Sequence, residues 1–163
     1  MSEEKENLLL RLVPPHSKVS REAVESDIER VVSEAKVLYN LCFMKNGLAI
    51  GARAMSHPQI EDKDPLRFFV TADKKLIINP IIIKHTNITV DNKEGCFSFK
   101  DNPPITVQRW HKIEVEFITL MVDPDNKDKF KFSSLLKDKL SGLEARIFQH
   151  EQDHIIGKYI FNY

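Results

Sequence analysis

The stretch FQHEQDHIIGKY at residues 148–159 constrains this chain more than any other. His150 and His154 are four residues apart, so on an α-helix both imidazoles lie on one face and can bind a single metal ion. Glu151 lies beside them and can accept a proton from a water on that ion. Such a spacing arises by chance in roughly one chain of this size in a hundred. The alternative is one turn of an ordinary charged helix.

The residues before this stretch place both histidines on the apolar side of the predicted helix. From about Leu135 the apolar residues recur at helical spacing, and Gly157 is a natural end for the helix. The stripe contains Leu136, Leu140, Leu143, Ile147, His150 and His154. Two imidazoles that face a core need polar partners, because burial of an unpaired polar group is unfavourable. The helical context therefore favours a metal site over a chance match.

The rest of the chain predicts an N-terminal helix and a block of strands. Residues 1–16 indicate a tether or an edge segment. A helix is expected from an N-cap at Ser20 to about Met44, because apolar residues recur there at helical spacing. A tight loop or short strand (GLAIGARAM) and a polar turn at 56–65 follow. The predicted strands are FFVTAD, KLIINPIIIK, NITVD, a long KIEVEFITLMVD and KFKF.

This order of elements indicates an α+β fold with mixed, mostly antiparallel strands and a C-terminal helix that carries the HExxH motif. With 163 residues, the chain is expected to form a single catalytic domain over residues 1–163. Its net charge of zero predicts no binding to nucleic acid or to an anionic membrane. The charged start is unlike a secretory signal, and two cysteines make no disulfide framework, which indicates a reducing compartment.

A catalytic metal site of this kind needs a third protein ligand. The nine residues after His154 contain no His, Asp, Glu or Cys, so the ligand must come from upstream. The candidates are Cys42, Cys96, His16, His57, His85, His111 and the carboxylates. Cys42 lies on the apolar stripe of the first helix, which favours core packing. The other histidines lie in polar stretches and are expected on the surface. Cys96 follows Gly95, which permits an unusual backbone path beside a ligand.

Two motifs together resemble the peptide deformylase family. They are EGCFS at residues 94–98 and QHEQDH at residues 149–154; LIINPIII and the pair Val107 and Arg109 resemble further family segments. The resemblance implies Cys96, His150 and His154 as metal ligands, Glu151 as general acid and base, and the Phe97 backbone N–H as an oxyanion donor. It implies ferrous iron, with zinc, nickel or cobalt as substitutes. The implied reaction removes the formyl group from N-terminal formyl-methionine of new polypeptides and releases formate.

One family segment departs from the pattern. Aligned on Gly-Leu-Ala, the family's glutamine, which donates to the oxyanion, falls on Ala52, and Gln59 is seven residues too late. Loss of one such donor typically lowers the rate 10²–10³-fold. Three explanations stay open: another group substitutes, of which Arg53 is the nearest, the loop follows a shifted path, or the activity is weak or altered. Asn46 stands where the family has an apolar residue. The expected substrate-binding residues are Gly47, Leu48, Gly95, Leu143 and Ile147.

Two alternatives stay open at this point. A degenerate, non-catalytic homologue would keep the metal site and bind nascent peptide or another partner. An amidase would act on a different small acyl group. The resemblance also implies a short form without the family's C-terminal helix, as in virus-borne members. The expected partners are formyl-methionine peptides of nascent chains, with the ribosome as a candidate. The expected location is the cytoplasm, a translating organelle or a host cytoplasm.

Overall fold

The computed structural model describes residues 3–14, 19–43, 53–99 and 101–160. The fold is α+β, as predicted, with a helix near the N-terminus, antiparallel strands and a C-terminal helix. The helices are α1 (Glu3–Leu9), α2 (Ile28–Phe43) and α3 (Gly142–Ile155), with short 3-10 helices η1 (Glu25–Asp27), η2 (His57–Gln59) and η3 (Phe97–Phe99). The strands are β1 (Ala54–Ser56), β2 (Phe68–Thr71), β3 (Leu76–His85), β4 (Thr89–Glu94), β5 (Ile105–Trp110), β6 (Lys112–Ile118), β7 (Leu120–Asp123), β8 (Asn126–Phe132) and β9 (Leu136–Ser141).

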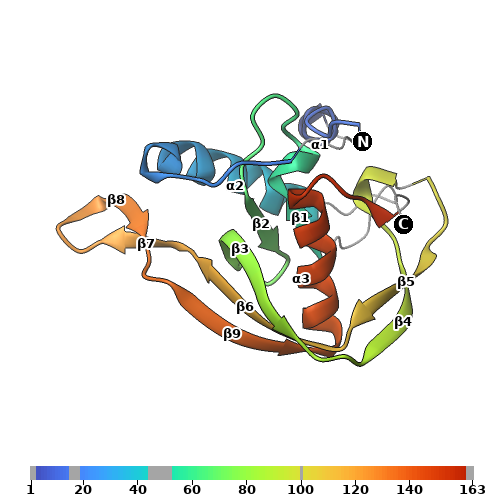
Figure 1. Cartoon of the computed structure of the whole chain (residues 1–163). Coiled ribbons are helices and arrows are strands. Elements are labelled where there is room, and N and C mark those ends of the chain that lie inside the picture. The colour runs from blue at the N-terminus through green and yellow to red at the C-terminus, as the bar shows by residue number, and fades with distance from the viewer. Residues whose placement is uncertain (1–2, 15–18, 44–52, 100, 161–163) are drawn as a thin grey trace.

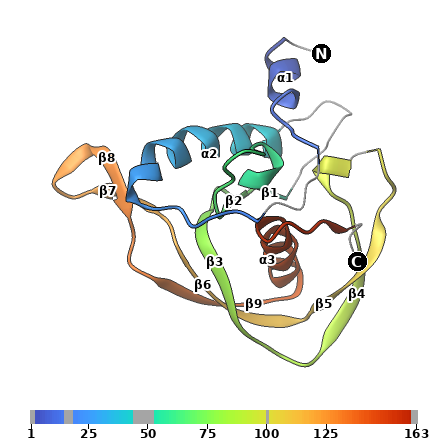
Figure 2. The same cartoon turned by 45° about the horizontal axis from the view of Figure 1, so that its top comes forward.

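The strands form three sheets. One has five strands in the order β1-β2-β3-β6-β9, and β4–β5 and β7–β8 form two-stranded ribbons. All pairs of these strands are antiparallel. In both Figure 1 and Figure 2, α3 lies inside the curve made by the larger sheet and the β4–β5 ribbon. Helix α3 therefore packs against two sheets at once, and different faces of the helix contact different strands.

Helix α2 buries the predicted apolar stripe but begins later than predicted. Val31, Leu38 and Cys42 are at most 1% exposed. Ser20 does not cap this helix; its hydroxyl donates to the carbonyl of Ile155, 2.8 Å away. The carboxylate of Asp27 instead accepts the backbone N–H of Val24 in the turn before the helix.

Two other segments differ from the sequence expectation. The N-terminal segment, expected to be a tether or an edge segment, forms the helix α1, whose Leu8 and Leu9 pack against the core that α2 covers. The predicted long strand is divided into β6 and β7 at Thr119. The backbone N–H of Thr119 donates to the Ser133 hydroxyl and its carbonyl accepts the Ser133 N–H. These bonds satisfy Thr119 outside the larger sheet, and the chain leaves the sheet there.

The C-terminal helix begins seven residues later than predicted. Leu136 and Leu140 lie on β9, which pairs with β6 along its whole length. Gly142 then takes a φ of +60°, a left-handed conformation that favours glycine, and α3 starts there. Gly157, with φ +82°, follows the helix as predicted. Strand pairing thus overrides the helical spacing of the leucines.

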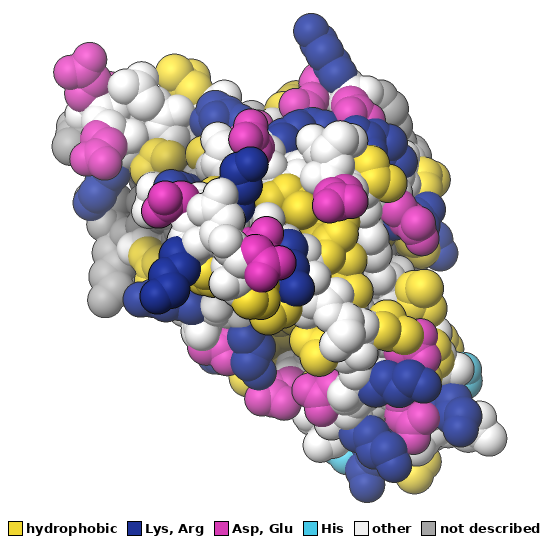
Figure 3. Space-filling model, turned by 90° about the vertical axis from the view of Figure 1, so that its left-hand side faces the viewer, with side chains coloured by type: hydrophobic (Ala, Val, Ile, Leu, Met, Phe, Trp, Pro, Cys, Tyr) yellow, Lys and Arg dark blue, Asp and Glu magenta, His cyan; other side chains and the backbone are white. Residues whose placement is uncertain are grey.

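The surface carries both signs of charge. On the face shown in Figure 3, basic and acidic side chains are intermixed around a band of hydrophobic side chains. Within the described residues, no helix has the length and apolar character needed to cross a bilayer.

Candidate metal centre

Three predicted ligands from two distant parts of the chain meet in the structure. Cys96 follows β4, and His150 and His154 lie one turn apart on α3. Cys96 Sγ is 3.5 Å from His154 Nε2, and the Nε2 atoms of the two histidines are 3.2 Å apart. All three ligand atoms lie within 4.8 Å of one another. Cys96 and His154 are 9% and 1% exposed, so the cluster is largely shielded from solvent.

The other ring nitrogen of each histidine is held by an acceptor. Nδ1 of His150 lies 2.8 Å from a carboxylate oxygen of Glu94, and Nδ1 of His154 lies 3.0 Å from the carbonyl of Lys158. An N–H donated from each Nδ1 leaves the Nε2 lone pairs directed into the cluster. Burial is the main reason that the pKa of His154 is held well below its usual value.

Glu94 is the centre of a buried ionic cluster that the sequence reasoning did not assign. Its carboxylate accepts hydrogen bonds from Arg109, Arg146 and His150. Burial acts to raise its pKa, but the bonds from His150 and Arg109 outweigh burial and lower the pKa to about 2. Arg109 also pairs with Asp153, 2.5 Å away. The one signal for Glu94 in the sequence was its position as the glutamate of the EGCFS motif.

Glu151 lies next to the ligands but outside the three-atom cluster. It is 3% exposed, and its carboxylate accepts the hydroxyl of Ser56 at 2.5 Å. Burial raises the pKa of Glu151 above its usual value. A buried carboxylate of this kind is suited to accepting and returning a proton. Ser56 was predicted to lie in a polar turn, yet it is fully buried at the end of β1.

Gln59, which the alignment on Gly-Leu-Ala left seven residues too late, lies beside Cys96 and Ser98. Its amide nitrogen lies 3.1 Å from Ser98 Oγ and 3.9 Å from Cys96 Sγ, and the residue is 1% exposed. Gln59 therefore reaches the site, although it is seven residues too late in the alignment. The η2 turn brings it in, because its side chain accepts the Ser56 N–H and closes a capping box.

The other predicted site residues fall into two groups. Gly47, Leu48, Asn46 and Ala52 lie outside the described residues. Phe97 begins η3 directly after Cys96. Gly95 does not take a left-handed conformation, but an added Cβ there would meet no atom of the described residues within 4 Å. Open space beside Cys96, rather than an unusual backbone path, is what Gly95 provides.

Ile147 lines a pocket between α3 and the larger sheet. The pocket has a volume of about 260 Å³, and Phe69, Phe117 and Leu140 are among its apolar lining residues. Arg53, the proposed substitute for the glutamine, lies at this pocket. Leu143 is 50% exposed and does not line it.

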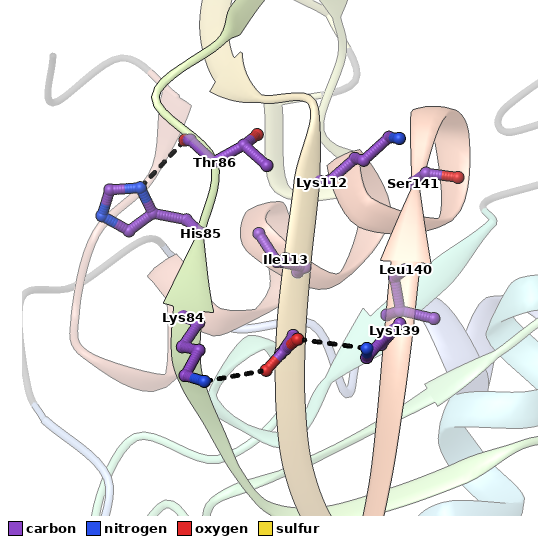
Figure 4. A pocket seen from close by; sticks show the side chains of 9 residues that line it. Lys84, His85, Thr86, Lys112, Ile113, Lys139, Leu140 and Ser141 are labelled. Atoms are coloured by element: carbon purple, nitrogen blue, oxygen red, sulfur yellow. Dashed lines mark hydrogen bonds and ion pairs between the residues drawn. The ribbon is translucent and has the colours of Figure 1, made fainter.

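Figure 4 shows a different hollow of about 440 Å³, where β3, β6 and β9 run side by side. Charged side chains line part of it: Glu114 pairs there with Lys84 and Lys139. Of the ligand candidates, His85 lines it.

The remaining ligand candidates lie elsewhere. Cys42 is buried in the core of α2, as expected. His85 is exposed and stacks on Trp110, whereas His57 is fully buried and stacks on Phe68, so its predicted exposure is wrong. His16 lies outside the described residues.

Comparison with known proteins agrees with these motifs. The family model for polypeptide deformylase matches residues 49–163. The peptide deformylase of Karelsulcia muelleri is 38% identical over 85 residues, covering 52% of this chain and 39% of the relative. The chloroplastic peptide deformylase 1B of Oryza sativa is 27% identical over 132 residues, covering 77% of this chain and 42% of the relative.

A solved structure of similar fold is the peptide deformylase of Thermotoga maritima. It superimposes with a TM-score of 0.69 at 24% identity, covering 90% of this chain and 88% of the other. The matched stretches span about two-fifths of the length of the curated relatives. Since the family model matches well over half of the chain, including both motifs, the chain belongs to the polypeptide deformylase family.

Proposed function

We propose that this chain is a metal-dependent hydrolase that removes the N-formyl group from formyl-methionine at the N-terminus of newly made polypeptides and releases formate. The observation that carries the proposal is the convergence of Cys96, His150 and His154 beside Glu151. Membership of the polypeptide deformylase family supports the same reaction. We propose residues 1–163 as one catalytic domain.

The three ligand atoms fit a divalent cation. A tetrahedral ion with Cys and His ligands at about 2.3 and 2.0–2.1 Å places neighbouring ligand atoms roughly 3.3–3.6 Å apart. Two of the three separations, 3.5 Å between Cys96 and His154 and 3.2 Å between the histidines, are close to these values, and all three ligand atoms lie within 4.8 Å of one another. A thiolate with two imidazoles suits iron, zinc, nickel or cobalt. We propose ferrous iron as the usual ion, with the others as substitutes.

When bound, the ion supplies a Lewis acid that polarises the formyl carbonyl and lowers the pKa of water. Glu151 is placed to accept the proton of the attacking water and to return it to the departing amine. Ser56, which donates to this carboxylate at 2.5 Å, limits its rotation. Two carboxylate oxygens allow Glu151 to keep that bond on one oxygen while the other receives the proton.

The developing oxyanion requires hydrogen-bond donors next to the carbonyl oxygen, where the negative charge develops. We propose the Gln59 amide and the Phe97 backbone N–H as these donors. They are neighbours, since Gln59 bonds to Ser98, the residue after Phe97. Gln59 supplies the donor whose absence favoured a non-catalytic homologue or an amidase for another acyl group, so neither alternative retains a specific observation.

The apolar pocket lined by Ile147 is proposed to receive the methionine side chain. Ile147 lies on α3 one turn before His150, so the pocket opens close to the proposed ligands. Apolar walls from Phe69 and Phe117 suit an unbranched thioether side chain. Gly95 leaves open space for the peptide backbone beside Cys96.

We propose that the chain acts where formylated polypeptides are made, in a cytoplasm or an organelle, with the nascent chain as substrate and the ribosome as a candidate partner. The rice relative is named as a chloroplastic protein.

The decisive experiment measures formate release from a formyl-Met tripeptide by protein loaded without oxygen with ferrous, nickel or cobalt ion. We expect Glu151→Gln to lower kcat about 10²–10⁴-fold, because proton transfer by a positioned residue contributes that much. The metal content should stay at the wild-type level. Glu29→Gln, at an exposed glutamate of α2, is the matched control and should keep full activity. Undiminished formate release by Glu151→Gln would refute the proposed mechanism, and acetyl-Met and propionyl-Met peptides test the acyl preference.

A further inference from the structure

We propose that Arg146 is a positioning residue of the metal centre: it fixes the Glu94 carboxylate, which in turn orients His150. This inference rests on the proposed metal-dependent function, and it assigns a role to a residue that neither sequence motif contains. Arg146 lies on α3 one turn before His150, so the two side chains share a face of the helix.

The guanidinium of Arg146 is buried and has three acceptors. Nη1 donates to a Glu94 carboxylate oxygen at 2.5 Å and to the Val107 carbonyl at 3.0 Å, and Nη2 donates to the Val90 carbonyl at 2.5 Å. The side chains of Arg146 and Glu94 are only 9% and 7% exposed. Val90 and Val107 belong to β4 and β5, so one side chain ties α3 to both strands of the ribbon.

The contacts on Glu94 are divided between its two oxygens. Oε1 accepts Nδ1–H of His150 at 2.8 Å and Nη2–H of Arg109 at 2.9 Å. Oε2 accepts Nε–H of Arg109 at 3.0 Å and Nη1–H of Arg146 at 2.5 Å. Arg109 alone binds the Glu94 carboxylate along one edge, and the carboxylate can still tilt about that edge. The bond from Arg146 comes from α3 itself, the helix that carries His150, and removes this freedom.

Charge balance gives a second reason for Arg146. Arg109 pairs with both Glu94 and Asp153, so without Arg146 one buried cation would face two carboxylates. An uncompensated buried charge is strongly unfavourable. With Arg146, the Glu94 carboxylate is paired with two guanidinium groups. The carboxylate that orients His150 is therefore held in place beside the ligands.

If Arg146 only connected α3 to the β4–β5 ribbon, its loss would have a different effect in experiments. Loss of such a connection lowers stability, but it leaves the arrangement of the ligand atoms in the folded protein unchanged. Loss of an orienting contact changes how His150 meets the ion. Residues that orient a metal ligand typically contribute 10–100-fold to metal affinity or activity. The geometry of the bound ion is thus the readout that separates the two roles.

The test uses Arg146→Met, which keeps the apolar length of the side chain, in cobalt-loaded full-length protein. We expect the cobalt dissociation constant to rise about 10–100-fold, with altered visible d–d bands and a retained thiolate charge-transfer band from Cys96. For a formyl-Met peptide, kcat should fall more than KM rises. Arg146→Lys keeps one donor group and should give intermediate affinity and spectra.

Arg21→Met is the matched control, because Arg21 also pairs with two carboxylates, Asp27 and Asp64, at a cluster remote in sequence from the ligands. It should lower the thermal midpoint without changing the cobalt spectrum or affinity. Wild-type cobalt affinity and spectrum in Arg146→Met would overturn the proposal, whatever its thermal midpoint. If that variant does not fold, wild-type values in Arg146→Lys would overturn it. Wild-type protein that binds no cobalt through a thiolate would instead refute the proposed metal site.

Discussion

The amide nitrogen of Gln59 lies 3.1 Å from Ser98 Oγ and 3.9 Å from Cys96 Sγ, beside the residues that flank Phe97. It is buried, and its carbonyl oxygen is occupied by the Ser56 N–H at 2.8 Å. The amide is therefore held with its N–H groups towards the site. At the scale of single residues, this preorganisation is what an oxyanion donor requires, because the donor need not move when the charge develops.

We expect Gln59→Ala to lower kcat for a formyl-Met peptide about 10²–10³-fold with little change in KM, because an oxyanion donor acts chiefly in the transition state. Steady-state formate release measures both constants. Gln108→Ala, at an exposed glutamine of β5, is the control and should match the wild type. A Gln59→Ala variant with full kcat would show that the oxyanion is stabilised by other groups.

At the scale of elements, the junction between β9 and α3 sets the start of the helix that carries two ligands. Ser141 is the last residue paired with β6, and Gly142 turns the chain into the helix with φ +60°. An L-residue in this conformation is strained by roughly 1–2 kcal/mol. An added Cβ would meet nothing within 4 Å, so the strain comes from the backbone alone.

Gly142→Ala should therefore lower the free energy of unfolding by about 1–2 kcal/mol, measured by denaturant titration of protein treated with a chelator. Gly142→Asn should lose less, since asparagine tolerates the left-handed region better. Gly95→Ala is the paired control: it has open space and no left-handed φ, so its stability should equal or slightly exceed that of the wild type. Equal stability of Gly142→Ala and the wild type would contradict the strain.

At the scale of the whole molecule, unfolding exposes His57, which is fully buried in η2. Its Nδ1 accepts the backbone N–H of Leu66 at 2.9 Å, and its ring stacks on Phe68. Burial, followed by the field of Arg30, lowers the pKa of His57 to about 3. The folded protein therefore keeps this ring neutral at a pH where the unfolded chain binds a proton.

The sign of the pH dependence follows from this difference. The unfolded ring protonates below about pH 6.5, so the stability from His57 is full above that pH and falls as the pH drops towards 3. Wild-type stability should lose up to about 1.4 kcal/mol per pH unit more than that of His57→Asn, which keeps an acceptor for Leu66. Denaturant titrations from pH 7 to 4, after chelation, give the difference. Parallel curves for the two proteins would contradict this assignment.

The features of this protein that depend on local spacing could be predicted from its amino-acid sequence. Helical geometry within one segment accounts for three of them: the i, i+4 histidines, the buried stripe of α2 with Cys42, and the end of α3 near Gly157. The motif around Cys96, together with the histidines, indicated the family. These features survive because each depends on residues only a few positions apart.

The features that depend on contacts between distant segments became visible only in the three-dimensional structure. The pairing of β9 with β6 takes Leu136 and Leu140 out of the predicted helix. The η2 turn brings Gln59 to Ser98, and Glu94 of β4 meets Arg109 of β5 and both Arg146 and His150 of α3. Spacing along one segment cannot reveal such meetings, because each buried polar group is satisfied by partners that the fold delivers from elsewhere in the chain.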